Sequence, residues 1–213
     1  MTDDLKTTIY TLGAPRSGTI YLNCLMSALY GSPSVDIISL GHSYEATRLV
    51  IDARSIAPHV VAIRDPYDAI SSDILGSMSE HVLTESPHRY IEDVTWLWES
   101  ILSSDIFFIA PFDVFTKSPT EIVGKLEIKH PSLAGLADLT VTNQTLEDIL
   151  AEHDNRSLGV DTAERRARGH VPRVNQPSKT AVLEMLHSKH YEPRFKYLFD
   201  MYSELENRYT NIK

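Results

Sequence analysis

Three short runs of apolar residues lie along the chain, and each has the β-branched and aromatic content of a fully buried strand. They are "TIYTLGA" at 8–14, "HVVAIRD" at 59–65 and "DIFFIAPF" at 105–112. Longer segments with helical periodicity separate them. Apolar runs of this kind indicate strands that are covered on both faces. Their alternation with helices predicts an α/β fold of three layers, with a mainly parallel sheet between two layers of helices.

The helical segments are predicted from apolar residues spaced three and four apart. A helix from Ser17 to about Tyr30 follows the first run, and "HRYIEDVTWLWESIL" at 88–102 leads into the third. After that run, "FDVFTKSPTEIVGKL" predicts a loop and then a helix with Ser118 as its cap and Pro119 in its first turn. The final part, from residue 178, predicts helices with an interruption at Pro193.

Length and composition indicate one globular domain over residues 1–213. The chain has 42% hydrophobic and 23% charged residues, which is ordinary for a folded protein. Its one cysteine, Cys24, lies in an apolar helical stretch and is predicted to be a small buried side chain. Residues 138–163 are mostly polar and predict a surface excursion.

The net charge of −9 argues against general binding to nucleic acid or to an anionic membrane. Any anion-binding site must therefore be local. The acidic start "MTDD" does not fit a signal peptide, and no run approaches the roughly 20 apolar residues that span a bilayer. These observations predict a cytoplasmic protein without a membrane span.

The first candidate site is "GAPRSGT" at 13–19, between the first strand and its helix. Such a loop directs backbone N–H groups and the positive end of the helix dipole at one point, which favours phosphate or sulfate. Gly13 and Gly18 permit close backbone approach, and Arg16 adds a permanent positive charge. The nucleoside triphosphate loop has a lysine after its second glycine, but here Thr19 stands at that position.

Two further segments could bind an anion. Arg64 leaves the second apolar run just before a helix that Pro66 opens, and Ser72 lies two turns along that helix. Arg16 and Arg64 are thus both predicted at carboxyl ends of strands, where ligands of parallel sheets bind. Alternatively, Arg64 forms a structural ion pair with Asp65. The third segment, "ERRARGHVPR" at 164–173, is either a solvated face or a basic segment that folds over an anion.

Taken together, these segments resemble the sulfotransferase family, which uses 3′-phosphoadenosine 5′-phosphosulfate as its donor. "PRSGTIYL" resembles the loop for the 5′-phosphosulfate, "RDPYDAISS" the 3′-phosphate motif, and "RARGHVPRV" the late segment that closes on the nucleotide. The resemblance runs from about Ile9 to about Tyr202. It implies a fold related to the P-loop nucleotide kinases.

The resemblance also implies the roles of individual residues. The 5′-phosphosulfate would be bound by Arg16, Ser17, Gly18 and Thr19. The 3′-phosphate would be bound by Arg64, Ser72, Arg168 and Gly169. One departure from the pattern is Ile20, which stands where the family has a second threonine.

Sulfuryl transfer also needs a base at the acceptor and a positive group at the leaving oxygen. Arg16 fits the second role. The family places a His or Glu base after the first helix, where "ISLGHSYEATR" offers His42 and Glu45, three residues apart and so on one helical face if the segment is helical. We favour His42, because imidazole ordinarily titrates near neutral pH.

Three functions remain open at this point. The first is a sulfotransferase that acts on a small-molecule or glycan acceptor and requires no metal. The second is a protein that binds the donor or its bisphosphate product without transferring a group, which Ile20 supports. The third is an ATP-dependent P-loop kinase, which the missing lysine after Gly18 disfavours.

Overall fold

A parallel sheet forms the centre of the computed structural model, which describes residues 6–53, 55–76, 82–141, 148, 178–188 and 190–213. Within these residues the strands are β1 (Thr7–Gly13), β2 (Val35–Gly41), β3 (His59–Ile63) and β4 (Phe107–Pro111). They lie in the order β2-β1-β3-β4, and every neighbouring pair is parallel. The predicted α/β fold with a parallel sheet is thus confirmed.

The strand that no apolar run predicted is β2. Of its seven residues only Val35 is buried, and Ile38 is 42% exposed. This follows from its place at the edge of the sheet, where it pairs with β1 alone among the described strands. By contrast, all five residues of β3 and all five of β4 are buried, which explains their continuous apolar sequences.

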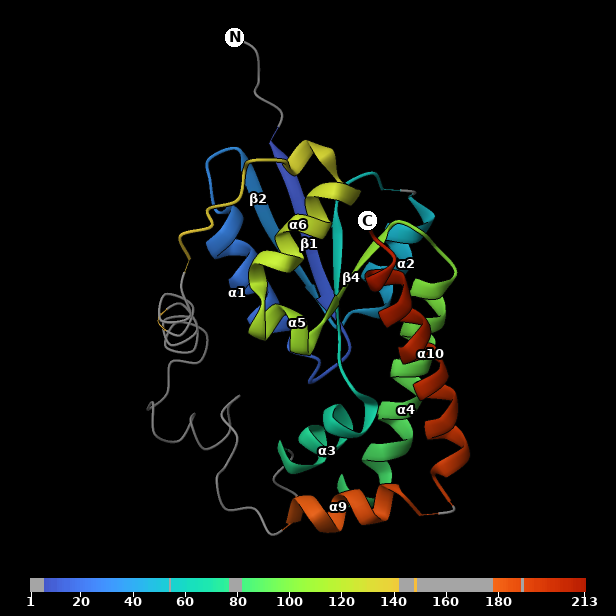
Figure 1. Cartoon of the computed structure of the whole chain (residues 1–213). Helices are drawn as coiled ribbons and strands as arrows, with labels where there is room; N and C mark the ends of the chain where they lie inside the picture. The colour runs from blue at the N-terminus through green and yellow to red at the C-terminus, as the bar shows by residue number, and fades with distance from the viewer. Residues whose placement is uncertain (1–5, 54, 77–81, 142–147, 149–177, 189) are drawn as a thin grey trace.

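Helices cover both faces of the sheet (Figure 1). One layer contains α1 (Thr19–Tyr30), α5 (Phe112–Lys117) and α6 (Pro119–Lys129), followed by a short 3₁₀ turn at Pro131–Leu133. The other layer contains α2 (Tyr44–Asp52), α4 (Val82–Leu102) and α10 (Glu192–Thr210). The remaining pair, α3 (Pro66–Gly76) and α9 (Ser178–Leu186), lies beyond the carboxyl end of the strands.

Three predicted boundaries can be compared with the helices of the structure. The first helix begins at Thr19 with Gly18 as its N-cap, so Ser17 belongs to the loop and not to the helix. Residues 112–117, predicted as a loop, form the helix α5. The predicted interruption at Pro193 is confirmed, because this proline lies in the first turn of α10, where its missing N–H leaves no intrahelical bond unmade.

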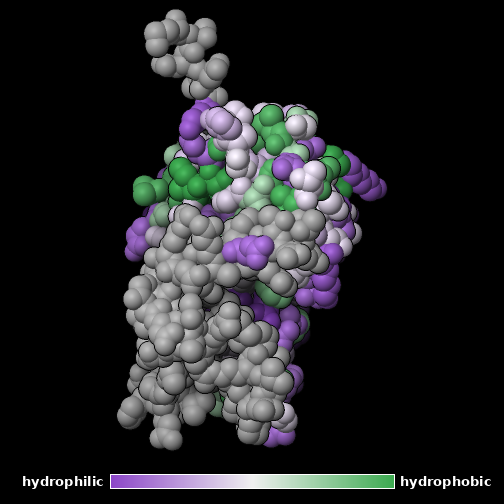
Figure 2. Space-filling model, turned by 90° about the vertical axis from the view of Figure 1, so that its left-hand side faces the viewer, coloured by the Kyte–Doolittle hydropathy of each residue, from purple (hydrophilic) through white to green (hydrophobic). Residues whose placement is uncertain are grey.

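Buried apolar side chains form one connected cluster between the layers. Trp98 is 2% exposed and belongs to this core, and Cys24, at 3% exposed, is buried as predicted. Apolar side chains that are exposed, such as Ile38 and Leu139, are few. Figure 2 shows hydrophobic residues interspersed with hydrophilic ones in the upper part of the face that it presents.

Among the described residues, no helix is long and apolar enough to cross a membrane. The predicted surface excursion and the basic segment at 164–173 fall almost wholly outside the described residues.

Candidate anion-binding site

Segments that follow the four strands meet at the carboxyl end of the sheet. The loop 14–18 follows β1, His42 follows β2, Arg64 follows β3, and Phe112 follows β4. The chain passes from β1 to β2 on one side and then returns to β3 on the other side of β1. Ligands of open parallel sheets bind at such a reversal, and the loop and Arg64 follow the two strands that flank it.

The loop is held in a conformation that depends on its glycines. Gly18 has φ 86°, which is left-handed, and a Cβ at this position would lie 2.7 Å from the Phe112 ring. Gly13 is restricted by space, since a Cβ there would lie 2.7 Å from the carbonyl oxygen of Ala62. Neither glycine can therefore carry a side chain without a shift in the backbone or in its neighbours.

Four consecutive carbonyl groups of the loop, those of residues 13–16, each accept a hydrogen bond. The donors, in order, are His42 Nδ1 at 2.7 Å, Ser17 Oγ at 2.6 Å, the Tyr90 hydroxyl at 2.5 Å and Arg64 Nη1 at 3.3 Å. The negative ends of these peptide dipoles thus accept hydrogen bonds from other groups of the protein.

The backbone N–H groups where α1 begins, by contrast, lack hydrogen-bond partners among the described residues. No described residue accepts a hydrogen bond from the N–H of Gly18, Thr19 or Ile20, which begin α1. These groups carry the positive end of the helix dipole. Engaged carbonyls beside open N–H groups form the polarity that an anion site requires.

Arg64 links the loop to β3 and β4. Its guanidinium lies 4.4 Å from the centre of the Phe112 ring, while Nη1 donates to the Arg16 carbonyl. The alternative ion pair with Asp65 is absent among the described residues, because Asp65 instead accepts a hydrogen bond from the Asp68 N–H at the start of α3. Arg64 therefore contacts the backbone of Arg16, which lies 48 residues away in the chain.

The hydroxyl groups of the loop are largely engaged with the loop itself. Ser17 is 1% exposed, and its Oγ bonds the Ala14 carbonyl and lies 3.3 Å from Thr19 Oγ1. Thr19 is 4% exposed. In this arrangement Ser17 stabilises the turn, and the backbone N–H groups are the donors left for an anion.

His42 lies next to the loop in a defined orientation. The Gly13 carbonyl can only accept, so Nδ1 carries the proton and Nε2 keeps its lone pair in the neutral ring. Glu45 lies in the first turn of α2, where it accepts a hydrogen bond from Ser43 Oγ at 3.2 Å. The expectation that His42 and Glu45 share a helical face is wrong, because Ser43 caps α2 and His42 precedes the helix.

Comparisons with known proteins show a similarity of structure but none of sequence. No protein-family model matches the chain, and no curated sequence matches it. Among solved structures, the chain is similar to the crystal structure of mouse sulfotransferase SULT7A1 complexed with PAP, at 13% identity and a TM-score of 0.48. The similarity covers 97% of this chain and 90% of that one. A likeness this low identifies no family, so the function is argued from the site.

The remaining predicted donor-site residues are not joined to the loop. Ser72 is half-buried in α3, and no hydrogen bond connects it to Arg64 among the described residues. Arg168 and Gly169 lie outside the described residues. Their roles stay predictions.

Two residues of the site were missed by sequence reasoning. Tyr90 was assigned only to a helix, and nothing local shows that its hydroxyl reaches a carbonyl 75 residues away. Phe112 had a usable signal, because it directly follows an apolar strand, as Arg64 does.

Two surface hollows of the described residues lie away from the loop. One is lined by α4 and α10 residues, including Trp96 and Tyr197, and another by residues that include Pro111 and Glu206. The candidate site is defined by its charge and backbone polarity. Among the described residues, no group of three or more His, Cys, Asp or Glu lies close enough to hold a metal ion.

Proposed function

We propose that this protein is a sulfotransferase that moves a sulfuryl group from 3′-phosphoadenosine 5′-phosphosulfate to a hydroxyl or amine. The observation that carries the proposal is the row of open N–H groups at Gly18, Thr19 and Ile20, beside two arginines. The order of motifs, "PRSGTIYL" before "RDPYDAISS", supports the same conclusion.

The residues present fit a donor with two separated anionic groups. The loop N–H groups and Arg16 would hold the 5′-phosphosulfate, which supplies the group to be transferred. Arg64 would hold the 3′-phosphate with Ser72, Arg168 and Gly169. Among the described residues Arg64 donates a hydrogen bond only to the Arg16 carbonyl, so its other N–H groups remain for a phosphate.

His42 is the proposed base. Its Nδ1 proton is engaged by Gly13, so Nε2 is the atom that would take the proton from the acceptor. The side chain is exposed, so an acceptor can reach it from solvent. The positive guanidinium of Arg16 would stabilise the negative charge on the leaving oxygen. The acceptor proposed is a small molecule or a glycan.

The first test is binding of the bisphosphate product, 3′-phosphoadenosine 5′-phosphate (PAP), by calorimetry, followed by transfer from labelled donor to an acceptor library. We expect PAP to bind, and transfer to be unaffected by a chelator. Absence of both binding and transfer would contradict the proposal. Turnover that depends on ATP and magnesium would instead indicate the kinase.

The base is tested by comparing His42→Ala with Glu45→Gln. Removing a general base costs about a hundredfold or more in turnover. We expect that loss for His42→Ala, with PAP affinity nearly unchanged, and little change for Glu45→Gln. The reverse pattern in steady-state kinetics would assign the base to Glu45.

A second candidate is a protein that binds the nucleotide without transferring a group. Ile20 favours it, because this residue replaces a hydroxyl that the resemblance places at the donor. PAP binding without transfer to any acceptor tested would support this candidate.

A further inference from the structure

The loop contains one strained residue. Among the described residues, Arg16 alone has a positive φ without being glycine, at 60°. A left-handed conformation costs an L-residue about 1–2 kcal/mol. Such a residue persists only where its surroundings hold it in place.

Two hydrogen bonds hold the peptide groups on either side of Arg16. The carbonyl of Pro15, before it, accepts from the Tyr90 hydroxyl at 2.5 Å, and its own carbonyl accepts from Arg64 at 3.3 Å. Rotation about φ turns the first peptide and rotation about ψ turns the second. Fixing both peptides therefore fixes Arg16 in its left-handed conformation.

Tyr90 is well placed to act as the fixed partner. It lies in α4 and is 5% exposed, so its ring is held by the core while its hydroxyl reaches the loop. Pro15 adds rigidity, because its ring restricts its own φ. In a trans peptide the C=O and N–H point in opposite directions. A bond that draws the Pro15 carbonyl toward Tyr90 therefore turns the Arg16 N–H away from α4.

We propose that Tyr90 is a positioning residue for the anion-binding loop. Its hydroxyl holds the Pro15 carbonyl, keeps Arg16 left-handed, and so presents the N–H groups that follow in the arrangement that binds the donor. The identity of the ligand rests on the proposed function, whereas the control of loop conformation does not.

The test distinguishes the contribution of the Tyr90 hydroxyl from that of its ring. Tyr90→Phe keeps the buried ring and removes the hydroxyl that bonds the Pro15 carbonyl. Tyr209→Phe is the matched control, because Tyr209 is 4% exposed and its hydroxyl donates to Glu121 at 2.9 Å, not to the loop. Both variants should lose similar thermal stability, and only Tyr90→Phe should affect the site.

For PAP measured by calorimetry, we expect Tyr90→Phe to bind about fivefold to tenfold more weakly than wild type, the value of one hydrogen bond. Its KM for the donor should rise by a similar factor. Tyr209→Phe should bind PAP as wild type does. In spectra of the ligand-free protein, the backbone amide signals of Arg16 and Gly18 should shift in Tyr90→Phe and not in Tyr209→Phe.

The outcomes separate the two proposals. If wild type binds PAP and Tyr90→Phe binds it equally well, the positioning role is overturned. If wild type does not bind PAP, the proposed function fails, and the amide signals then decide the role of Tyr90. Unchanged signals for Arg16 in Tyr90→Phe would overturn it.

Discussion

Basic side chains lie at both ends of the parallel sheet, but their surroundings differ. At the carboxyl end, Arg16 and Arg64 lie beside open backbone N–H groups. At the amino end, His59, Lys129 and His130 lie close together at the start of β3 and the end of α6. The first group faces a candidate ligand site, whereas in the second His59 is fully buried and Lys129 and His130 are half-buried.

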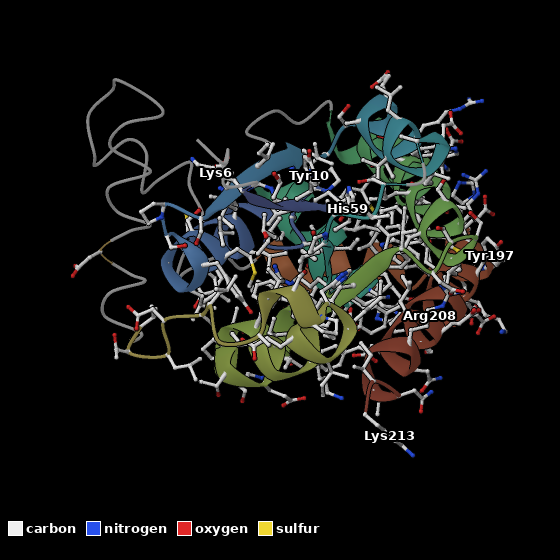
Figure 3. The ribbon with its side chains drawn as sticks, turned by 90° about the horizontal axis from the view of Figure 1, so that it is seen from above. Lys6, Tyr10, His59, Tyr197, Arg208 and Lys213 are labelled. Atoms are coloured by element: carbon white, nitrogen blue, oxygen red, sulfur yellow. The ribbon has the colours of Figure 1, made fainter. Side chains whose placement is uncertain are left out.

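His59 is the centre of the amino-end group. It is fully buried, stacks on Tyr10 with ring centres 4.8 Å apart, and contacts Phe107 edge-on at 6.1 Å. Figure 3 shows Tyr10 and His59 side by side, from the neighbouring strands β1 and β3. Neither ring nitrogen has a hydrogen-bond partner among the residues that the structure describes. Burial lowers the pKa of His59; the backbone of Ala57 opposes this shift, but its approach does not form a hydrogen bond.

The pKa values of Lys129 and His130 are lowered as well. Burial is the main cause that lowers the pKa of Lys129, although its Nζ donates to the Phe107 carbonyl at 2.6 Å and Asp105 opposes the shift. Burial, then Lys129 and His59, lower the pKa of His130. A cluster of basic residues is therefore not an anion site by itself. The carboxyl end of the sheet differs for two reasons. Arginine cannot lose its charge, and the backbone N–H groups at the start of α1 have no acceptor among the described residues.

The largest expected effect concerns how closely the carboxyl end is packed. Gly18→Ala adds a Cβ to a left-handed residue and against Phe112, so we expect a loss of about 3 kcal/mol in the free energy of unfolding. Gly41→Ala is the control, since Gly41 has φ 61° but nothing within 4 Å, and should lose about 1 kcal/mol. Equal losses in urea unfolding would contradict the close packing on Phe112.

The next effect concerns how the histidines at the amino end of the sheet make stability depend on pH. Because the folded pKa values of His59 and His130 lie below the unfolded value of about 6.5, the unfolded chain binds more protons in acid. The free energy of unfolding should therefore fall as the pH is lowered through about 6.5. His59→Phe should reduce this loss, and an unchanged pH slope would contradict a lowered pKa of His59 in the folded protein.

A smaller effect distinguishes the two ends by ligand binding. Arg64→Lys keeps the charge but loses the planar fork and the stacking on Phe112, so PAP affinity should fall about tenfold. Lys129→Met, at the amino end, should leave PAP affinity unchanged. Calorimetry on both variants measures this, and equal losses would mean that overall charge, not the site, attracts the ligand.

The smallest effect concerns Ile20. Ile20→Thr should raise PAP affinity about fivefold if the new hydroxyl reaches the donor, because one hydrogen bond is worth about 1 kcal/mol. Ile20→Val has the same shape as threonine without the hydroxyl and should leave affinity unchanged. Equal affinities of the two variants would show that position 20 contributes only its backbone N–H.

Much of the fold could be predicted because its signals are local. Strands buried on both faces have continuous apolar sequences, so β1, β3 and β4 were found, whereas the edge strand β2 has too few buried residues to show the pattern. The loop and Arg64 were found for a similar reason, since each directly follows a buried strand. Tyr90 could not be found this way, because its bond to Pro15 spans 75 residues.

Local patterns were enough to predict the parallel α/β arrangement and two arginines at neighbouring strand ends, because burial and helix periodicity show in residues close together in the chain. Which groups of the loop form hydrogen bonds and which stay open depends on contacts between distant elements. The tertiary structure brought Tyr90, Arg64 and His42 onto carbonyl groups of the loop and left the N–H groups of Gly18, Thr19 and Ile20 without an acceptor among the described residues. Hydrogen bonds depend on distance and direction between elements far apart in the chain, and no local pattern specifies these.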